Sequence, residues 1–122
     1  MSKMLLSIKP EYVEKIVSGK KQFEFRKFHC REDVDTIVIY ATTPIKRVIG
    51  EVSIISIVEG RVEDVWKQTS SKGGITKTAF HEYYKNKDMA IAYELGTVKT
   101  YNEPIELSAV GLSYVPQSFA YI

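Results

Sequence analysis

The sequence predicts an α+β fold: a small, partly closed β-barrel of about five to six strands, flanked by two to three helices. Short segments that are wholly apolar or alternate with a period of two outnumber the segments with apolar residues at helical spacing. Turn-forming residues separate these segments, and no repeat or linker-like tract divides the chain. We therefore expect residues 1–122 to form a single domain around one core.

The first strand, the first helix and the second strand are predicted within residues 5–28. Pro10 follows a short apolar strand, at a position where a helix can begin without losing a hydrogen bond. Apolar side chains then recur on one helical face until Gly19, where we expect the helix to end. Beyond Gly19 the period changes to two, so residues 22–26 should form a strand with one apolar and one charged face.

A β-hairpin is predicted next. Residues 36–41 are apolar and largely β-branched, as in a strand that is covered on both sides. A turn at 42–44 leads into a second strand at 48–57, in which Gly50 allows a bulge or a close backbone approach. Glu51 is an acid in largely apolar company in this strand.

The second half of the chain is predicted to add two helices and further strands. In order, the expected elements are a helix beginning near Gly60, a flexible loop at 70–74, a helix capped by Thr76 and ending at 86–88, a strand at 89–95 closed by Gly96, and weaker strands at 98–101 and 105–108 around a turn at 102–104. Strands therefore outnumber helices.

Charge is distributed unevenly along the chain. The net charge is only +2, but residues 1–31 alone carry eight lysines and arginines against three glutamates. Such an asymmetry indicates an anionic partner near the N-terminal unit, such as a nucleotide or an RNA backbone. The alternative is that these lysines are solvated surface side chains.

The sequence does not favour a membrane protein, a secreted protein or a metalloprotein. No apolar run has the length that a bilayer requires, and the N-terminus reaches charged residues too soon for a secretory signal, so we expect a cytoplasmic protein. His29, Cys30 and His81 are too few and too badly spaced for a closed zinc site, so neither a metal nor a cofactor is predicted. A Cys30 nucleophile assisted by a histidine stays an alternative.

The strongest candidate for chemistry is the pattern GxKxxExR, which places Lys21, Glu24 and Arg26 at its marked positions. Residues two apart in a strand lie roughly 7 Å apart on one face, so Glu24 and Arg26 can reach a shared ligand. The alternative is a simple ion pair between them on an exposed strand face.

The chain resembles the ASCH family, small domains of the PUA-like superfamily, over essentially its whole length. The resemblance lies in SIKPEYVEKIVSGKKQFEFRK, which contains the GxKxxExR pattern, and in VIYATTP, VIGEVSI and the closing PQSFAYI. It implies a PUA-like β-barrel with a cleft lined by Lys21, Glu24 and Arg26, and a role in RNA binding or RNA-linked regulation. Some members resemble amidohydrolases that deacylate acetylcytidine with a threonine nucleophile, but Glu24 occupies the matching position here.

Further residues are candidates for the cleft wall from their local chemistry. They are Lys9 at the end of the first strand, Tyr40 and Thr42 at the end of a barrel strand, Glu51 as an inward-facing acid, and Gln117 with Ser118 at the closing strand. Each has a structural alternative, because tyrosines are often core residues and a buried acid is often paired with a lysine.

Three functions compete on these observations. The first is an RNA- or nucleotide-binding domain with a regulatory role in RNA metabolism, transcription or translation. In it Lys9, Lys21 and Arg26 meet phosphate, Tyr40 or Tyr84 stacks a base, and Glu24 or Gln117 reads base edges. The second is a small hydrolase that acts on a modified nucleoside amide or single-stranded RNA, with Lys21 and Glu24 as the catalytic pair. The third is a protein interaction adaptor that docks through Trp66 or Tyr83.

Overall fold

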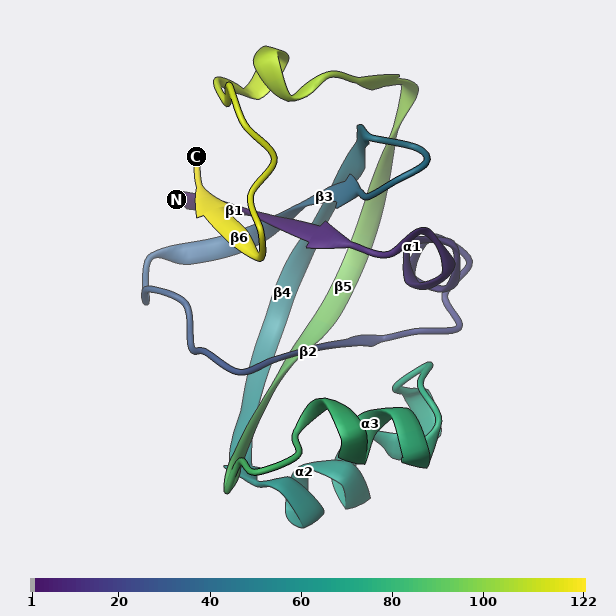
Figure 1. The fold of residues 1–122 in the computed structure, drawn as a ribbon, viewed down its shortest axis with the longest axis vertical. Helices are drawn as coiled ribbons and strands as arrows, with labels where there is room; N and C mark the ends of the chain where they lie inside the picture. The colour runs from purple at the N-terminus through teal and green to yellow at the C-terminus, as the bar shows by residue number, and fades with distance from the viewer. Residues whose placement is uncertain (1) are drawn as a thin grey trace.

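The computed structural model describes residues 2–122 and contains a curled six-stranded sheet with three α-helices beside it (Figure 1). The elements are β1 (Ser2–Ile8), α1 (Pro10–Val17), β2 (Phe23–Arg26), β3 (Val34–Ala41), β4 (Arg47–Arg61), α2 (Val62–Thr69), η1 (Ser70–Lys72), α3 (Lys77–Tyr83), β5 (Met89–Ile105), η2 (Leu107–Val110) and β6 (Phe119–Tyr121). The predicted α+β class and partly closed barrel are confirmed.

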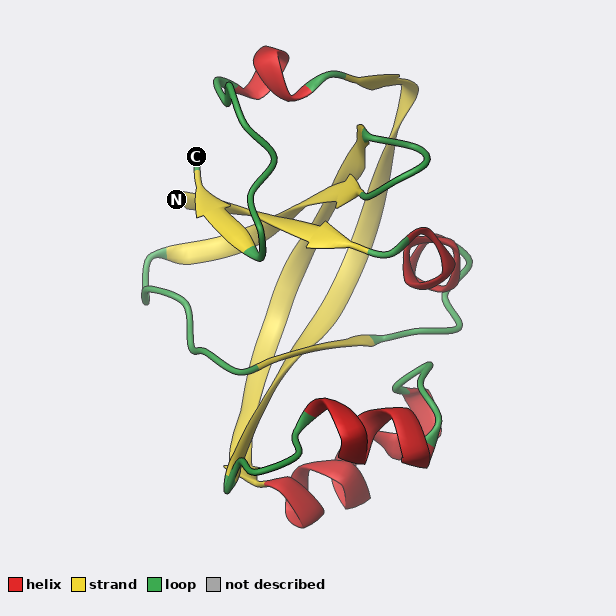
Figure 2. Cartoon of the chain, in the orientation of Figure 1, coloured by secondary structure: helices red, strands yellow, loops and turns green. Residues whose placement is uncertain are grey.

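The strand order in the sheet is β2-β5-β4-β3-β1-β6. Strands β1 and β3 run parallel, and the other neighbouring pairs are antiparallel. The long strands β4 and β5 extend along most of the molecule, and β2, which pairs with β5, lies between α1 on one side and the pair α2 and α3 on the other (Figures 1 and 2). This position places β2 next to helices from both halves of the chain.

The curl of the sheet brings β2, at one end of the strand order, close to β1 and β6 at the other. A side chain rather than a backbone ladder joins them: Arg26 of β2 donates to the carbonyl oxygen of Ser7 in β1 at 3.0 Å and to that of Ser118, just before β6, at 3.4 Å. The rings of Phe28 and Phe119 stack beside this junction with centroids 4.2 Å apart. The half-barrel is therefore closed by side chains.

Strands β4 and β5 differ from the prediction. The structure has one continuous strand from Met89 to Ile105, so Gly96 does not close it and residues 102–104 are not a turn. Likewise β4 continues to Arg61, beyond the predicted end at 57. The two strands pair with each other from Val48 to Arg61, with three register shifts, and this pairing overrides the local turn signals. A strand was expected at residues 105–108, but β5 ends at Ile105 and residues 107–110 form a short 3₁₀ helix.

The hairpin of β3 and β4 and the close approach at Gly50 are confirmed. A Cβ atom at Gly50 would lie 2.3 Å from the carbonyl oxygen of Lys99 on β5, so only glycine fits between the strands. The predicted N-cap is also confirmed, because Thr76 Oγ1 accepts a hydrogen bond from the backbone N–H of Ala79 at 3.1 Å.

Two hydrophobic clusters hold the helices against the sheet. The buried residues Val13 and Ile16 of α1 belong to a cluster formed mainly with β1 and β3. Val65 of α2 and Phe80 of α3 pack with Phe25 of β2, and the Phe25 and Phe80 rings meet edge to face at 5.1 Å. Phe25 thus holds α3 against β2.

Candidate functional site

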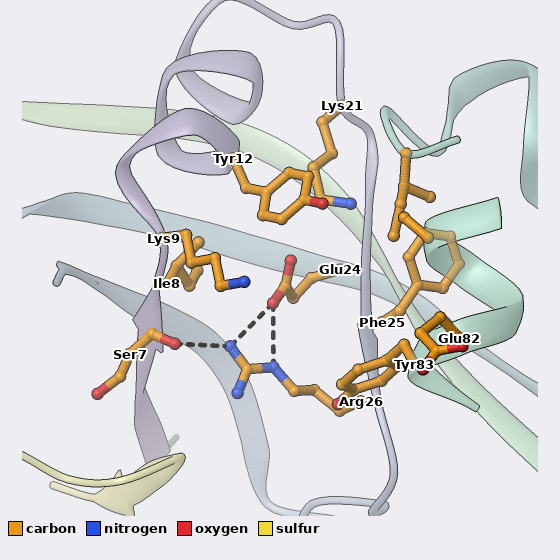
Figure 3. Close-up of a pocket in the computed structure, with 12 residues that line it drawn as sticks. Ser7, Ile8, Lys9, Tyr12, Lys21, Glu24, Phe25, Arg26, Glu82 and Tyr83 are labelled. Carbon is orange, nitrogen blue, oxygen red and sulfur yellow. Dashed lines mark hydrogen bonds and ion pairs between the residues drawn. The ribbon is translucent and has the colours of Figure 1, made fainter. Parts of the chain in front are cut away.

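A cleft of about 460 Å³ opens between the start of α1, strand β2 and helix α3 (Figure 3). Its walls are formed by Ser7, Ile8, Lys9, Tyr12, Lys21, Glu24, Phe25, Arg26, Ile75, Ala79, Glu82 and Tyr83. This volume falls within the range of small-molecule sites in proteins. Lys21, Glu24 and Arg26, the marked residues of the GxKxxExR pattern, all line this cleft.

Arg26 is committed to the protein itself. Its Nε and Nη2 lie 3.0 and 2.9 Å from the same oxygen of Glu24, Oε2. Nη2 also donates to the carbonyl oxygen of Ser7, while Nη1 reaches the carbonyl oxygen and Oγ of Ser118. Every guanidinium nitrogen therefore has a partner, and Arg26 fixes the position of Glu24 rather than offering a free donor to a ligand.

Glu24 presents its other carboxylate oxygen to the cleft. Both contacts from Arg26 fall on Oε2, which leaves Oε1 without a partner from Arg26. Within residues 2–122 no buried side-chain oxygen lacks a hydrogen-bond partner, so Oε1 is not buried and reaches the open space of the cleft. Figure 3 shows this carboxylate facing the same space as Lys9, Tyr12 and Lys21. A fixed carboxylate with one free oxygen can accept a hydrogen bond or a proton from a bound molecule.

Lys21 is a buried amine, with only 3% of its surface exposed. Its Nζ donates to the carbonyl oxygen of Gly73 at 2.7 Å and lies over the rings of Tyr12 and Phe25, 5.2 and 4.7 Å from their centroids. Burial lowers the pKa of Lys21 to about 8, because the effect of the Glu24 charge is smaller. A substantial fraction of this amine is therefore neutral just above physiological pH.

Two tyrosines from different helices form the aromatic part of the cleft. Tyr12 belongs to α1 and Tyr83 to α3, and each has a lysine ammonium over its ring, with Lys27 4.5 Å from the centroid of Tyr83. Burial raises the pKa of both phenols, so they stay neutral donors. Tyr84, one of the two tyrosines predicted to stack a base, is instead buried, and its hydroxyl donates to the carbonyl oxygen of Arg26 at 2.8 Å.

Several predicted wall residues lie outside the cleft. Tyr40 packs in a core cluster with Leu5 and Val38. Its side chain points to this side of the sheet because the alternate residues of β3 point to the other side, where α1 packs. Glu51 binds Lys3 Nζ and Tyr101 Oη, each at 3.1 Å, on another part of the sheet. Thr42 does not line the cleft, and its backbone N–H donates to Ile8. Gln117 is exposed, and Ser118 takes part only through Arg26.

Some residues of the site were not predicted for it from the sequence. Tyr12 and Tyr83 were assigned to apolar helix faces, and the residues 70–74 were expected to be a flexible loop. In the structure, 70–72 form a 3₁₀ helix and the following Gly73 holds the Lys21 amine. Lys9 does line the cleft, as its position before α1 suggested.

The other candidate groups show no reactive arrangement. The described part of the chain contains no cluster of three or more His, Cys, Asp or Glu residues that could hold a metal ion. Burial raises the pKa of the Cys30 thiol, whose backbone N–H donates to Tyr93 Oη at 2.9 Å, so the nucleophilic thiolate is disfavoured. No helix within residues 2–122 is long and apolar enough to span a membrane.

Comparison with known proteins identifies a family model and similar sequences. A family model described as "ASCH domain" matches residues 6–105. The ASCH domain-containing ribonuclease of Zymomonas mobilis is 34% identical over 92 residues, which are 75% of this chain and 62% of that protein. The large ribosomal subunit protein uL22 of Ureaplasma parvum serovar 3 is 27% identical over 120 residues, 98% of this chain but 39% of that protein.

Solved structures agree with the sequence matches. The crystal structure of ASCH from Zymomonas mobilis superimposes with a TM-score of 0.88 at 30% identity, covering 98% of this chain and 87% of that one. The N-terminal domain of McrB from Staphylothermus marinus has a TM-score of 0.53 at 15% identity, over 91% of this chain and 81% of that one, a likeness of fold alone. The chain spans between about two fifths and three fifths of the two named sequence relatives.

Proposed function

The chain belongs to the ASCH domain family, and we propose that it binds single-stranded RNA in the cleft between α1, β2 and α3. One relative is named a ribonuclease, an enzyme that acts on RNA, and this name supports RNA as the ligand class. Binding without turnover would make the domain a regulator in RNA metabolism, the role that the family resemblance implies.

The observation that carries the proposal is the convergence of cations and tyrosines in one concave site. Lys9 and Lys21 supply ammonium groups for a phosphate, and Tyr12 and Tyr83 supply rings for a base. Because the cleft has the volume of one small ligand, it suits a single nucleotide of an unpaired strand rather than a duplex. Arg26 contributes indirectly by holding Glu24.

Fluorescence anisotropy with an end-labelled 12-nucleotide single-stranded RNA tests this proposal. We expect Lys9→Met and Lys21→Met each to weaken binding about five-fold or more and to reduce the salt dependence of log K by roughly one counterion. Lys87→Met is the matched control, because Lys87 is exposed and does not line the cleft. Equal loss in all three variants, or binding that does not depend on salt, would reject the cleft as the RNA site.

Phosphodiester cleavage is a second candidate, favoured by the buried amine of Lys21 beside the carboxylate of Glu24. A neutral Lys21 amine can take the proton of a ribose 2′-hydroxyl while the 2′-oxygen attacks the adjacent phosphorus. The bond to the 5′-oxygen breaks and that oxygen takes up a proton from solvent, while Lys21 returns its proton to solvent. The products are a 2′,3′-cyclic phosphate and a 5′-hydroxyl. The negative charge of Glu24 favours the ammonium that Lys21 becomes once it has taken this proton.

Cleavage has a clear signature in gel assays with end-labelled RNA. The rate should increase with pH up to about 8 and then level off, following the neutral fraction of Lys21. An RNA with 2′-deoxyribose at every position should bind but remain intact, because the attacking hydroxyl is missing. If Lys21→Met cleaves RNA as fast as the unmodified protein, the activity does not come from this amine.

A further inference from the structure

The segment between α2 and α3 makes three contacts with the chain around Lys21. The carbonyl oxygen of Gly73 accepts from Lys21 Nζ at 2.7 Å, and that of Lys72 accepts from the backbone N–H of Gln22 at 2.8 Å. The carbonyl oxygen of Gly74 lies 3.4 Å from Lys15 Nζ. Residues 72–74 therefore present successive carbonyl groups to the residues that precede β2.

Gly74 fits this place because it has no side chain. A Cβ atom there would lie 2.5 Å from Lys21 Cβ, 2.8 Å from its Cγ and 3.0 Å from its Cα. The backbone of Gly74 also has a φ of +65°, which disfavours other residues. The clash would fall on the first atoms of the lysine side chain and on its backbone, which cannot move aside without shifting the strand.

The contacts also explain how an amine can be buried without a carboxylate bound directly to it. A main-chain carbonyl satisfies one donor of Lys21 but adds no full negative charge, and the Tyr12 and Phe25 rings cover the group. Glu24 binds Arg26 through Oε2. The burial that distinguishes this lysine from a surface lysine therefore depends on the segment lying flat against it.

We propose that Gly73 and Gly74 are positioning residues for Lys21: the Gly73 carbonyl oxygen aims the amine into the cleft, and the absence of a Cβ at Gly74 lets the segment pack against Lys21 and exclude water. Neither residue touches the bound RNA on this proposal. The effect on RNA rests on the proposed function, whereas the effect on the amine does not.

The direct test is the titration of Lys21 in protein labelled with ¹³C at lysine Cε, followed by NMR. Gly74→Ala should separate the segment from Lys21, admit water and raise the pKa of Lys21 by about one unit or more toward its ordinary value. Gly111→Ala is the matched control, because Gly111 has a φ of +87° and nothing lies within 4 Å of a Cβ placed there. It has the same backbone strain without the clash and should leave the Lys21 titration unchanged.

The outcomes separate the two proposals. A raised pKa of Lys21 together with RNA affinity reduced to that of Lys21→Met supports both. A raised pKa with unchanged RNA affinity supports the positioning role and counts against Lys21 as an RNA contact. An unchanged pKa in Gly74→Ala would overturn the positioning role.

A measurement on the unmodified protein covers the case in which Gly74→Ala does not fold. The Gln22 amide should be protected from hydrogen exchange by its bond to the Lys72 carbonyl oxygen. Exchange of the Gln22 amide at the rate of an unstructured peptide would show that the segment is not seated, and would overturn the proposal.

Discussion

Replacing Lys21 with methionine should change how the free energy of unfolding depends on pH. Burial lowers the pKa of Lys21 in the folded chain from its ordinary value of 10.5 to about 8. Between these two values the unfolded chain binds more protons than the folded chain, so stability rises as the pH increases. Below pH 8 the lysine is charged in both states, and folding bears the full cost of burying that charge.

The size of the effect follows from the two pKa values. Integrated from pH 7 to pH 9, the lowered pKa of Lys21 increases the free energy of unfolding by about 1 to 2 kcal/mol. Methionine has a similar length, fills the space between Tyr12 and Phe25, and does not titrate. The advantage of Lys21→Met over the unmodified protein should therefore be largest at pH 7 and should shrink by about 1 to 2 kcal/mol at pH 9.

Urea unfolding at pH 7, 8 and 9, monitored by Trp66 fluorescence, measures this difference. Other titrating groups cancel when the two proteins are compared at the same pH, provided the substitution leaves their surroundings intact. Lys87→Met provides the control: it removes an exposed lysine, so its difference from the unmodified protein should not vary over this range. A Lys21→Met difference that is equally constant would refute the burial of a charged amine at the cleft.

Three further predictions concern the surroundings of the cleft. Arg26→Met leaves the Glu24 carboxylate without its partner and should reduce the free energy of unfolding by about 3 to 5 kcal/mol in urea titrations, with part of the loss restored when Glu24→Gln is added. Thr76→Ala removes the side-chain cap of α3 and should cost about 1 kcal/mol by the same measurement, and no change would show that the cap is dispensable. The pKa of His81 is raised by its bonds to the carbonyl oxygen at position 77 and to Glu63, so its stabilising charge is fully present below the ordinary value of 6.5 and is lost as the pH rises through the raised pKa. Glu63→Gln should lower that pKa in an NMR titration of the imidazole protons, and an unchanged titration would contradict the role of the Glu63 contact.

Local rules predicted the elements that depend on local chemistry. Pro10 marked the start of α1, Thr76 marked the start of α3, and the alternation of residues after Gly19 placed Glu24 and Arg26 on one face of β2. These features depend on backbone restrictions and on the period of a strand, which act over a few residues.

The remaining features of the site depend on contacts between distant parts of the chain. Tyr12 and Tyr83 come from α1 and α3, helices that lie far apart in the sequence, so no spacing in the sequence links them. The partners of Arg26 include carbonyl groups at positions 7 and 118, which reach it only because the sheet curls. The alternation along β3 shows which residues share a face with Tyr40, but it does not show which face of the sheet carries the cleft. Tyr40 lies on the face that packs with Leu5 and Val38.

The length of β5 has a consequence for the behaviour of the protein at high concentration. Strand β2 covers only Ile91 to Glu94 of β5, so from Thr97 to Ile105 one side of β5 has no neighbouring strand among the residues that the structure describes. Such an open margin invites intermolecular β-pairing and aggregation. Lys99 and Glu103 place charges along this edge, and Pro104 has no N–H to donate to an incoming strand. Charged residues and proline at an edge strand disfavour self-association.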